Sequence, residues 1–204
     1  KKLEIKWTCE MRFEKHLTRE LLASMRDAGC LKIVFGLESF NQRVMDFMKK
    51  GIKQEWVRRI ADDCVDLGIA VHCYIIVGFP TETESEAFET MNFIVNHERL
   101  HSSYGFSCQP CLFDLEKEAP IMSDPGSYGI RRIMRPSAED LSLGFFYEVS
   151  EGMTPDEAER LYQHVYEKVS EVVCELPFNY SMADGLLYIA RAKAQEVRVP
   201  QPAG

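Results

Sequence analysis

Polar residues that could bind a ligand stand directly after three apolar segments of this sequence. Glu10 and Arg12 follow the first segment, and an arginine there could hold a carboxylate through two parallel hydrogen bonds. Glu38 and Ser39 follow the second segment, and Gly78 closes the third, where a missing side chain lets the backbone approach a ligand. Ligands of parallel α/β folds gather at the carboxyl ends of the strands, so a ligand site is sought first at these strand ends.

Each of these residues also has a purely structural interpretation. A surface ion pair explains Glu10 and Arg12 equally well. Ser39 could cap the following helix while Glu38 completes the turn. We favour ligand contact for this second pair, because two adjacent polar groups at a strand end suit a ligand face. The turn at 78–80 needs Gly and Pro for its shape whether or not it binds anything.

Apolar segments separated by helix signals supply the elements that would position these residues. Residues 70–77 are almost all apolar and rich in β-branched types, which predicts a fully buried parallel strand. Capping residues such as Thr18 and Asn41 precede apolar positions at helical spacing. Alternation of strands and helices predicts an α/β fold with a parallel sheet in chain order, doubly wound or part of a (β/α) barrel. The strands are predicted at 3–9, 31–37, 70–77 and 102–108.

The pattern changes after the fourth predicted strand. Proline and glycine become frequent without a clear period, and helix signals then return. Thr154 and Pro155 with Glu157 predict a strong helix start, and a last helix is predicted from Ser181. We therefore divide the chain into a strand and helix part at 1–110, a long loop at 111–136, and a mostly helical C-terminal extension at 137–204.

Composition narrows the classes of partner and compartment. No apolar run reaches the ~20 residues that span a bilayer, and the first residues carry no apolar stretch of a signal peptide, so a cytoplasmic protein without membrane contact is predicted. The net charge of -8 argues against nucleic acid and favours a small-molecule substrate or a protein. An uncovered sheet edge or face would invite a homo-oligomer, unless the C-terminal helices cover it.

The seven cysteines are spread over apolar segments and do not form a disulfide framework. Cys108 and Cys111 make a lone C-x-x-C pair, which is weak support for zinc, so we interpret both as core thiols. His72 lies inside an apolar segment and is interpreted as a core or barrel-lining histidine. The residue spacings predict no metal site.

Several phrases of the sequence resemble, in order, the radical S-adenosylmethionine (radical SAM) enzyme superfamily, most closely the branch with an additional cobalamin-binding domain. They cover residues 3–95 and read IKWTCEMR, MRDAGCLKIVFGLES, MKKGI and GIAVHCYIIVGFPTETESEAFETMNF. The resemblance implies a partial (β/α) TIM-type barrel of six units, of which this chain looks like the C-terminal part from the third unit onward.

The resemblance also implies roles for single residues, and it predicts that Arg12, Glu38, Ser39, Ile76 and Gly78 converge around one groove. Polar groups at Glu38 and Ser39 would hydrogen-bond the ribose and methionine portions of S-adenosylmethionine, while Ile76, Gly78 and Pro80 would pack its adenine. The family often carries an acid three residues after the glycine. In this chain that position is Thr81, and the acid is Glu82.

An intact enzyme of this family cleaves S-adenosylmethionine to a 5'-deoxyadenosyl radical at a four-iron four-sulfur cluster, and the cobalamin branch often transfers a methyl group. The family's cluster-binding loop, C-x3-C-x-x-C, is absent from this sequence, so the chain alone is predicted to be inactive. A missing N-terminal barrel half would carry that loop. The alternatives are a cluster-free binding or interaction module on the same scaffold and, with least support, a (β/α) enzyme that binds phosphate at Gly78.

Overall fold

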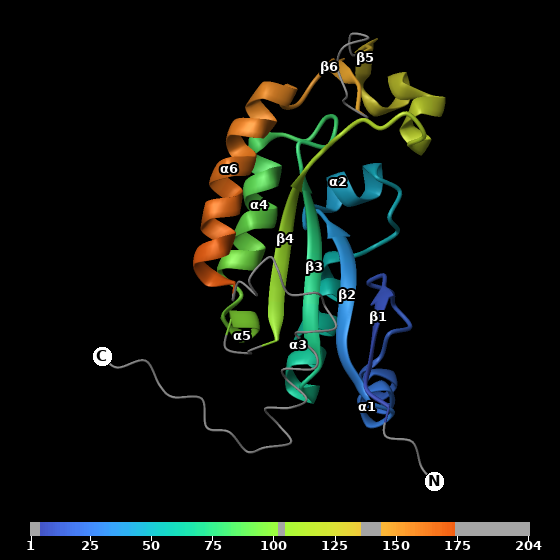
Figure 1. Cartoon of the computed structure of the whole chain (residues 1–204), viewed down its shortest axis with the longest axis vertical. Helices are drawn as coiled ribbons and strands as arrows, with labels where there is room; N and C mark the ends of the chain where they lie inside the picture. The colour runs from blue at the N-terminus through green and yellow to red at the C-terminus, as the bar shows by residue number, and fades with distance from the viewer. Residues whose placement is uncertain (1–4, 102–104, 136–143, 174–204) are drawn as a thin grey trace, which may run out of the picture. The chain divides into compact units, whose positions relative to one another are not determined.

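Four parallel strands form one sheet in chain order in the computed structural model, which describes residues 5–101, 105–135 and 144–173 (Figure 1). The strands are β1 (Trp7–Met11), β2 (Cys30–Glu38), β3 (Ala70–Val77) and β4 (Phe106–Leu112). The predicted parallel order, with β3 inside the sheet, is confirmed. Both the first and the last strand run past their predicted ends at residues 9 and 108, because alternating apolar residues continue across these boundaries. Residues 3–4 and 102–104 of these predictions lie outside the described residues.

In the described part of the chain, six α-helices connect and follow the strands, and most begin at a residue whose side chain accepts a hydrogen bond from the first turn. The predicted caps Thr18, Asn41 and Thr154 all do so, and Thr83 caps the helix after β3. The helices are α1 (Arg19–Asp27), α2 (Gln42–Phe47), α3 (Gln54–Leu67), α4 (Glu84–Val95), α5 (Glu98–His101) and α6 (Pro155–Val172).

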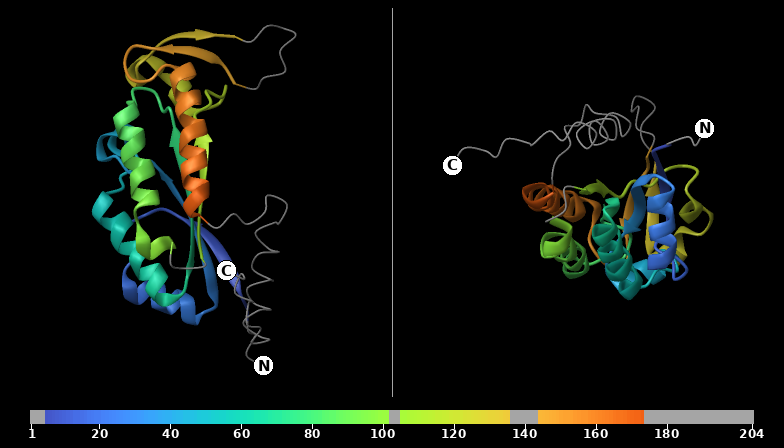
Figure 2. Two further views of the ribbon diagram at one scale, coloured as in Figure 1. Left: turned by 90° about the vertical axis from the view of Figure 1, so that its left-hand side faces the viewer. Right: turned by 90° about the horizontal axis from the view of Figure 1, so that it is seen from below.

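The described helices lie on one side of the sheet (Figure 2), and along β3 only the face toward these helices is fully buried. Along β3 the buried residues Val71, Cys73, Ile75 and Val77 alternate with half-buried ones. The prediction that this strand is buried on both faces is therefore wrong, because no described helix covers its second face. We call the second face, which carries Ala70, His72, Tyr74 and Ile76, the inner face. Helix α6 packs against α4 and the edge strand β4, which agrees with the expectation that a C-terminal helix covers an edge.

One further strand and two short 3-10 helices lie inside the predicted loop, and the partner of that strand lies beyond it. β5 (Ile130–Met134) pairs antiparallel with β6 (Phe146–Val149), and two short 3-10 helices, Pro120–Ser123 and Pro125–Tyr128, precede them. The loop prediction for 111–136 is therefore wrong: β4 runs past residue 110, and β5 lies inside the range. Two adjacent exposed arginines interrupt the alternation of apolar and polar residues in β5. The local pattern therefore does not predict this strand, because its pairing with β6 depends on contacts between residues distant in sequence. The two strands and the 3-10 helices before them share a small separate core, which contains Leu115, Ile121, Ile130 and Tyr147.

The C-terminal extension contains both kinds of element. β6 lies within the range predicted as mostly helical, whereas α6 begins at Pro155 as predicted. The helix predicted from Ser181 lies outside the described residues. The three-part domain division itself stays a prediction, as does the cytoplasmic location. Among the residues that the structure describes, no helix has the length and apolar character needed to cross a membrane.

Position 78, directly after β3, requires a glycine for two reasons, which are its backbone conformation and its packing. Its φ is 83°, and a Cβ placed on it would lie 2.4 Å from the Cβ of Ala158 on α6. The backbone therefore turns at a point that is so close to α6 that only the hydrogen atom of a glycine fits in place of a side chain.

Gly78→Ala should lower the free energy of unfolding by about 2–4 kcal/mol, because it adds backbone strain to the overlap with α6. Urea unfolding measures this loss. Gly126→Ala is the matched control, since the nearest atom to its added Cβ is 3.9 Å away, and it should change stability by less than about 1 kcal/mol. Equal losses in the two variants would contradict the packing argument.

Candidate functional site

A groove of about 670 Å³ opens where β1 and β2 end. Its lining includes three residues singled out from the sequence, Glu10, Arg12 and Glu38, together with Gly36 and Tyr74. The volume suits a small organic molecule. The structure thus brings together polar side chains from two neighbouring strand ends.

Glu38 is held in a strained backbone conformation at the edge of this groove. Its φ is 62°, in the left-handed region, and the pairing of β2 with β3 shifts register between Gly36 and Glu38. A Cβ at Gly36 would lie 2.7 Å from Glu38 Oε1, so the glycine makes room for the carboxylate. Such strain in a non-glycine residue is typical of functional positions.

Lys50 lies beside the groove and contacts two of its lining residues, and it was not singled out from the sequence. Its Nζ donates to Glu38 Oε1 at 2.8 Å, and its backbone carbonyl accepts a hydrogen bond from the Arg12 guanidinium. Lys50 lies in the loop after α2. No local sequence pattern links it to Glu38, because the two residues are 12 positions apart. Arg12 and Lys50 are therefore the cations in and beside the groove, while Glu10, Glu14 and Glu38 supply its carboxylates, and charges of both signs suit a zwitterionic ligand.

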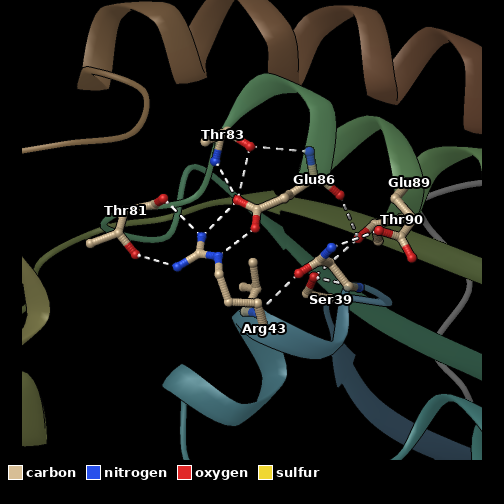
Figure 3. A network of polar contacts seen from close by, with 9 residues as sticks. Ser39, Arg43, Thr81, Thr83, Glu86, Glu89 and Thr90 are labelled. Atoms are coloured by element: carbon tan, nitrogen blue, oxygen red, sulfur yellow. Dashed lines mark hydrogen bonds and ion pairs between the residues drawn. The ribbon is translucent and has the colours of Figure 1, made fainter.

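The other predicted site residues do not enter this groove. Ser39 is fully buried, and its Oγ lies 3.1 Å from Thr90 Oγ1 on α4 and accepts a hydrogen bond from the Asn41 amide (Figure 3). These contacts match its structural interpretation. Gly78 and Pro80 are buried in the turn after β3, the former against α6. Ile76 is half-buried on the inner face, paired in register with Cys111. Cofactor contact by any of these residues stays a prediction.

Arg43 on α2 ties the end of β2 to the turn after β3 (Figure 3). Its Nη1 donates to Thr81 Oγ1 at 3.1 Å, and its Nη2 donates to the Thr81 carbonyl at 2.9 Å and to Glu86 Oε2 at 2.6 Å. This guanidinium lowers the pKa of Glu86 to about 2. Thr81 has a φ of 72°, so the contacts hold a threonine in the left-handed conformation that normally favours glycine.

Glu82 is buried inside the same turn. Only 1% of its surface is exposed, Oε2 accepts from the Gly78 amide at 2.8 Å, and Oε1 has no partner among the described residues. Burial raises the pKa of Glu82 to about 8, so the carboxyl is protonated at neutral pH. Its backbone carbonyl accepts from the Met153 amide at 2.9 Å. The acid after the glycine therefore stabilises the turn from within.

The described cysteines form no ligand set. All six are free thiols, and no group of three His, Cys, Asp or Glu residues in the described part of the chain could hold a metal ion. Burial raises the pKa of Cys30 to about 11 and that of Cys64 to about 12, and it also raises those of Cys108 and Cys111. Thiols that resist deprotonation are poor metal ligands. Cys108 and Cys111 are only half-buried, so their interpretation as core thiols stays a prediction.

Comparison with known proteins finds a family match in the N-terminal half of this chain. Residues 4–94 match the model of the Radical SAM superfamily. An uncharacterized methyltransferase of Pyrococcus horikoshii is 30% identical over 91 residues, which are 45% of this chain and 20% of that protein. A putative methylthiotransferase of Methanocaldococcus jannaschii is 32% identical over 86 residues, which are 41% and 18% of the two chains. The match thus spans about a fifth of these relatives.

A solved structure shares the fold. Coproporphyrinogen III oxidase from Escherichia coli, described as a radical SAM enzyme, aligns with a TM-score of 0.52 at 12% identity. The alignment covers 82% of this chain and 32% of that one. The four parallel strands thus resemble part of a radical SAM barrel. That they correspond to its C-terminal part stays a prediction, because the family match covers only residues 4–94 and none of the chain's C-terminal part.

The buried carboxyl of Glu82 predicts a pH-dependent stability. The folded chain keeps a proton on Glu82 that the unfolded chain loses above about pH 4.5, so the free energy of unfolding falls as the pH rises from about 4.5 to about 8. Glu82→Gln removes this titration and keeps an acceptor for the Gly78 amide. Its stability relative to the wild type should therefore increase with pH, by at most about 1.4 kcal/mol per unit.

Urea unfolding at pH 5, 6, 7 and 8 measures the difference. Glu84→Gln is the control, because Glu84 is exposed in the first turn of α4 and should give a constant difference over this range. A constant difference for Glu82→Gln as well would show that Glu82 is ionised in the folded chain.

Proposed function

We propose that this chain is part of a methyltransferase-like or methylthiotransferase-like radical SAM enzyme and that its groove binds S-adenosylmethionine, because residues 4–94 match the model of the Radical SAM superfamily. The observation that carries the proposal is the strained Glu38, whose carboxylate lies in a groove at the strand ends beside Lys50 and Arg12. Ligands of (β/α) barrels bind at this end of the strands.

The chemistry of the groove fits this cofactor. S-adenosylmethionine carries an amine, a carboxylate and two ribose hydroxyls. The carboxylates of Glu10 and Glu38 can accept hydrogen bonds from amine and hydroxyl groups, and the cations of Arg12 and Lys50 can donate to a carboxylate. The bound cofactor would supply the radical chemistry, while these side chains bind it, orient it and exclude water.

The iron-sulfur cluster does not fit the described residues, because their cysteines form no ligand set. In this proposal, the cluster ligands and the rest of the barrel belong to the remainder of a longer parent enzyme, and this chain alone is inactive. Cobalamin as a second cofactor, with methyl transfer to a small molecule or protein, is part of the proposal and is supported by the sequence phrases that resemble the cobalamin branch. A cluster-free binding module is the competing function, favoured by the same lack of thiolate ligands.

Removing the Glu38 carboxylate tests the cofactor site. In the intact parent enzyme, Glu38→Ala should weaken S-adenosylmethionine binding by about 10- to 100-fold, the effect of losing a hydrogen bond to a charged group. Glu55→Ala on the exposed side of α3 is the control and should leave the affinity unchanged. Isothermal titration calorimetry measures both. Equal affinities in the two variants would place the cofactor elsewhere, and binding by a parent without a cluster would favour the binding module.

A further inference from the structure

A second polar cluster lies on the inner face, next to the groove. Val34 and Tyr74 line the groove, and Lys32 and His72 each stand two residues earlier on the same strands, so their side chains point to the same face. In the sheet register, Ser107 pairs with His72. Three neighbouring strands therefore contribute Lys32, His72 and Ser107 to one region.

The contacts of this cluster leave hydrogen-bonding capacity unused. His72 Nδ1 lies 2.8 Å from Ser107 Oγ, and the imidazole packs edge to face against the ring of Tyr74 at 4.7 Å. Within the described part of the chain, no hydrogen bond or ion pair involves Lys32 Nζ or His72 Nε2. Both atoms can therefore bind a ligand without breaking a contact.

Lys32 is partly removed from water and, within the described part of the chain, forms no ion pair with a carboxylate. It is half-buried on the second strand of the sheet, and burial lowers its pKa. Burial and, to a smaller degree, the positive charge of Lys32 lower the pKa of His72 to about 4. On the same face, the Glu38 carboxylate is paired with Lys50, and Glu10 is exposed. A desolvated cation without a counter-charge is costly, and a bound anion would remove that cost.

We propose that Lys32, His72 and Ser107 form a subsite for an anionic oxygen group of the substrate, either a carboxylate or a phosphate. Lys32 supplies the charge, and the imidazole and hydroxyl supply hydrogen bonds. That the bound molecule is the substrate rests on the proposed function, since the cluster lies beside the cofactor groove. The binding of an anion does not rest on it.

Nuclear magnetic resonance of the 204-residue chain tests the subsite without any cofactor. At pH 6.5 and constant ionic strength, inorganic phosphate and acetate are titrated separately in place of chloride, while the ring signals of His72 are followed. We expect a saturable shift at His72 with at least one of the two anions, and the stronger binder identifies the preferred group. The exposed His164 is the internal reference and should not shift saturably.

Lys32→Met should weaken the anion response by about tenfold or more, because a charge-assisted contact is lost. Lys53→Met, which removes an exposed lysine paired with Asp46, should leave the response unchanged. If Lys32→Met does not fold, two other variants are measured. Lys32→Arg keeps the positive charge, and Ser107→Ala should weaken the anion response by less than is expected for Lys32→Met.

Three results would overturn the subsite: no saturable shift at His72, an equal shift at His164, or an unchanged response in Lys32→Met. The cofactor proposal fails separately. If the chain responds to anions but the parent enzyme does not bind S-adenosylmethionine, only the proposed function is contradicted. If the parent binds S-adenosylmethionine but the chain does not respond to anions, only the subsite is contradicted.

Discussion

The guanidinium of Arg43 joins the helix that follows β2 to the turn that follows β3, and the geometry of the site depends on this connection. It binds Thr81 through both hydroxyl and carbonyl and binds the Glu86 carboxylate in the first turn of α4. Beneath it, Glu82 is buried against the Gly78 amide. The ends of two neighbouring strands are thereby fixed relative to each other, which a ligand site built from separate strands requires.

The two faces of the sheet have different roles because they have different surroundings. Helices bury the apolar side chains of one face, which provides the hydrophobic stabilisation. The inner face carries charged and polar groups instead, with Glu38 and Lys50 at the strand ends and Lys32 and His72 deeper along the strands. This arrangement allows a cofactor and a substrate anion to bind side by side on one face.

The sequence predicted the features that local residue patterns determine. The parallel strand order and the caps at Thr18, Asn41 and Thr154 depend on short stretches of chain, and they are confirmed. Features set by distant contacts were missed. Ser39 bonds to Thr90 across 51 positions, β5 pairs with a strand beyond an intervening segment, and Lys50 reaches Glu38 through the fold of a loop. No local pattern contains this information.

The most direct test of this account compares the stability of Arg43→Ala with that of Arg19→Ala by urea unfolding. Both arginine side chains are 48% exposed, but among the described residues Arg19 forms ion pairs only with Asp63 and Asp66, whose side chains are 14% and 40% exposed. Arg43→Ala should lower the free energy of unfolding by about 1.5–3 kcal/mol. Arg19→Ala should cost less than about 1 kcal/mol. Equal small losses in the two variants would contradict the claim that Arg43 holds the two strand ends together.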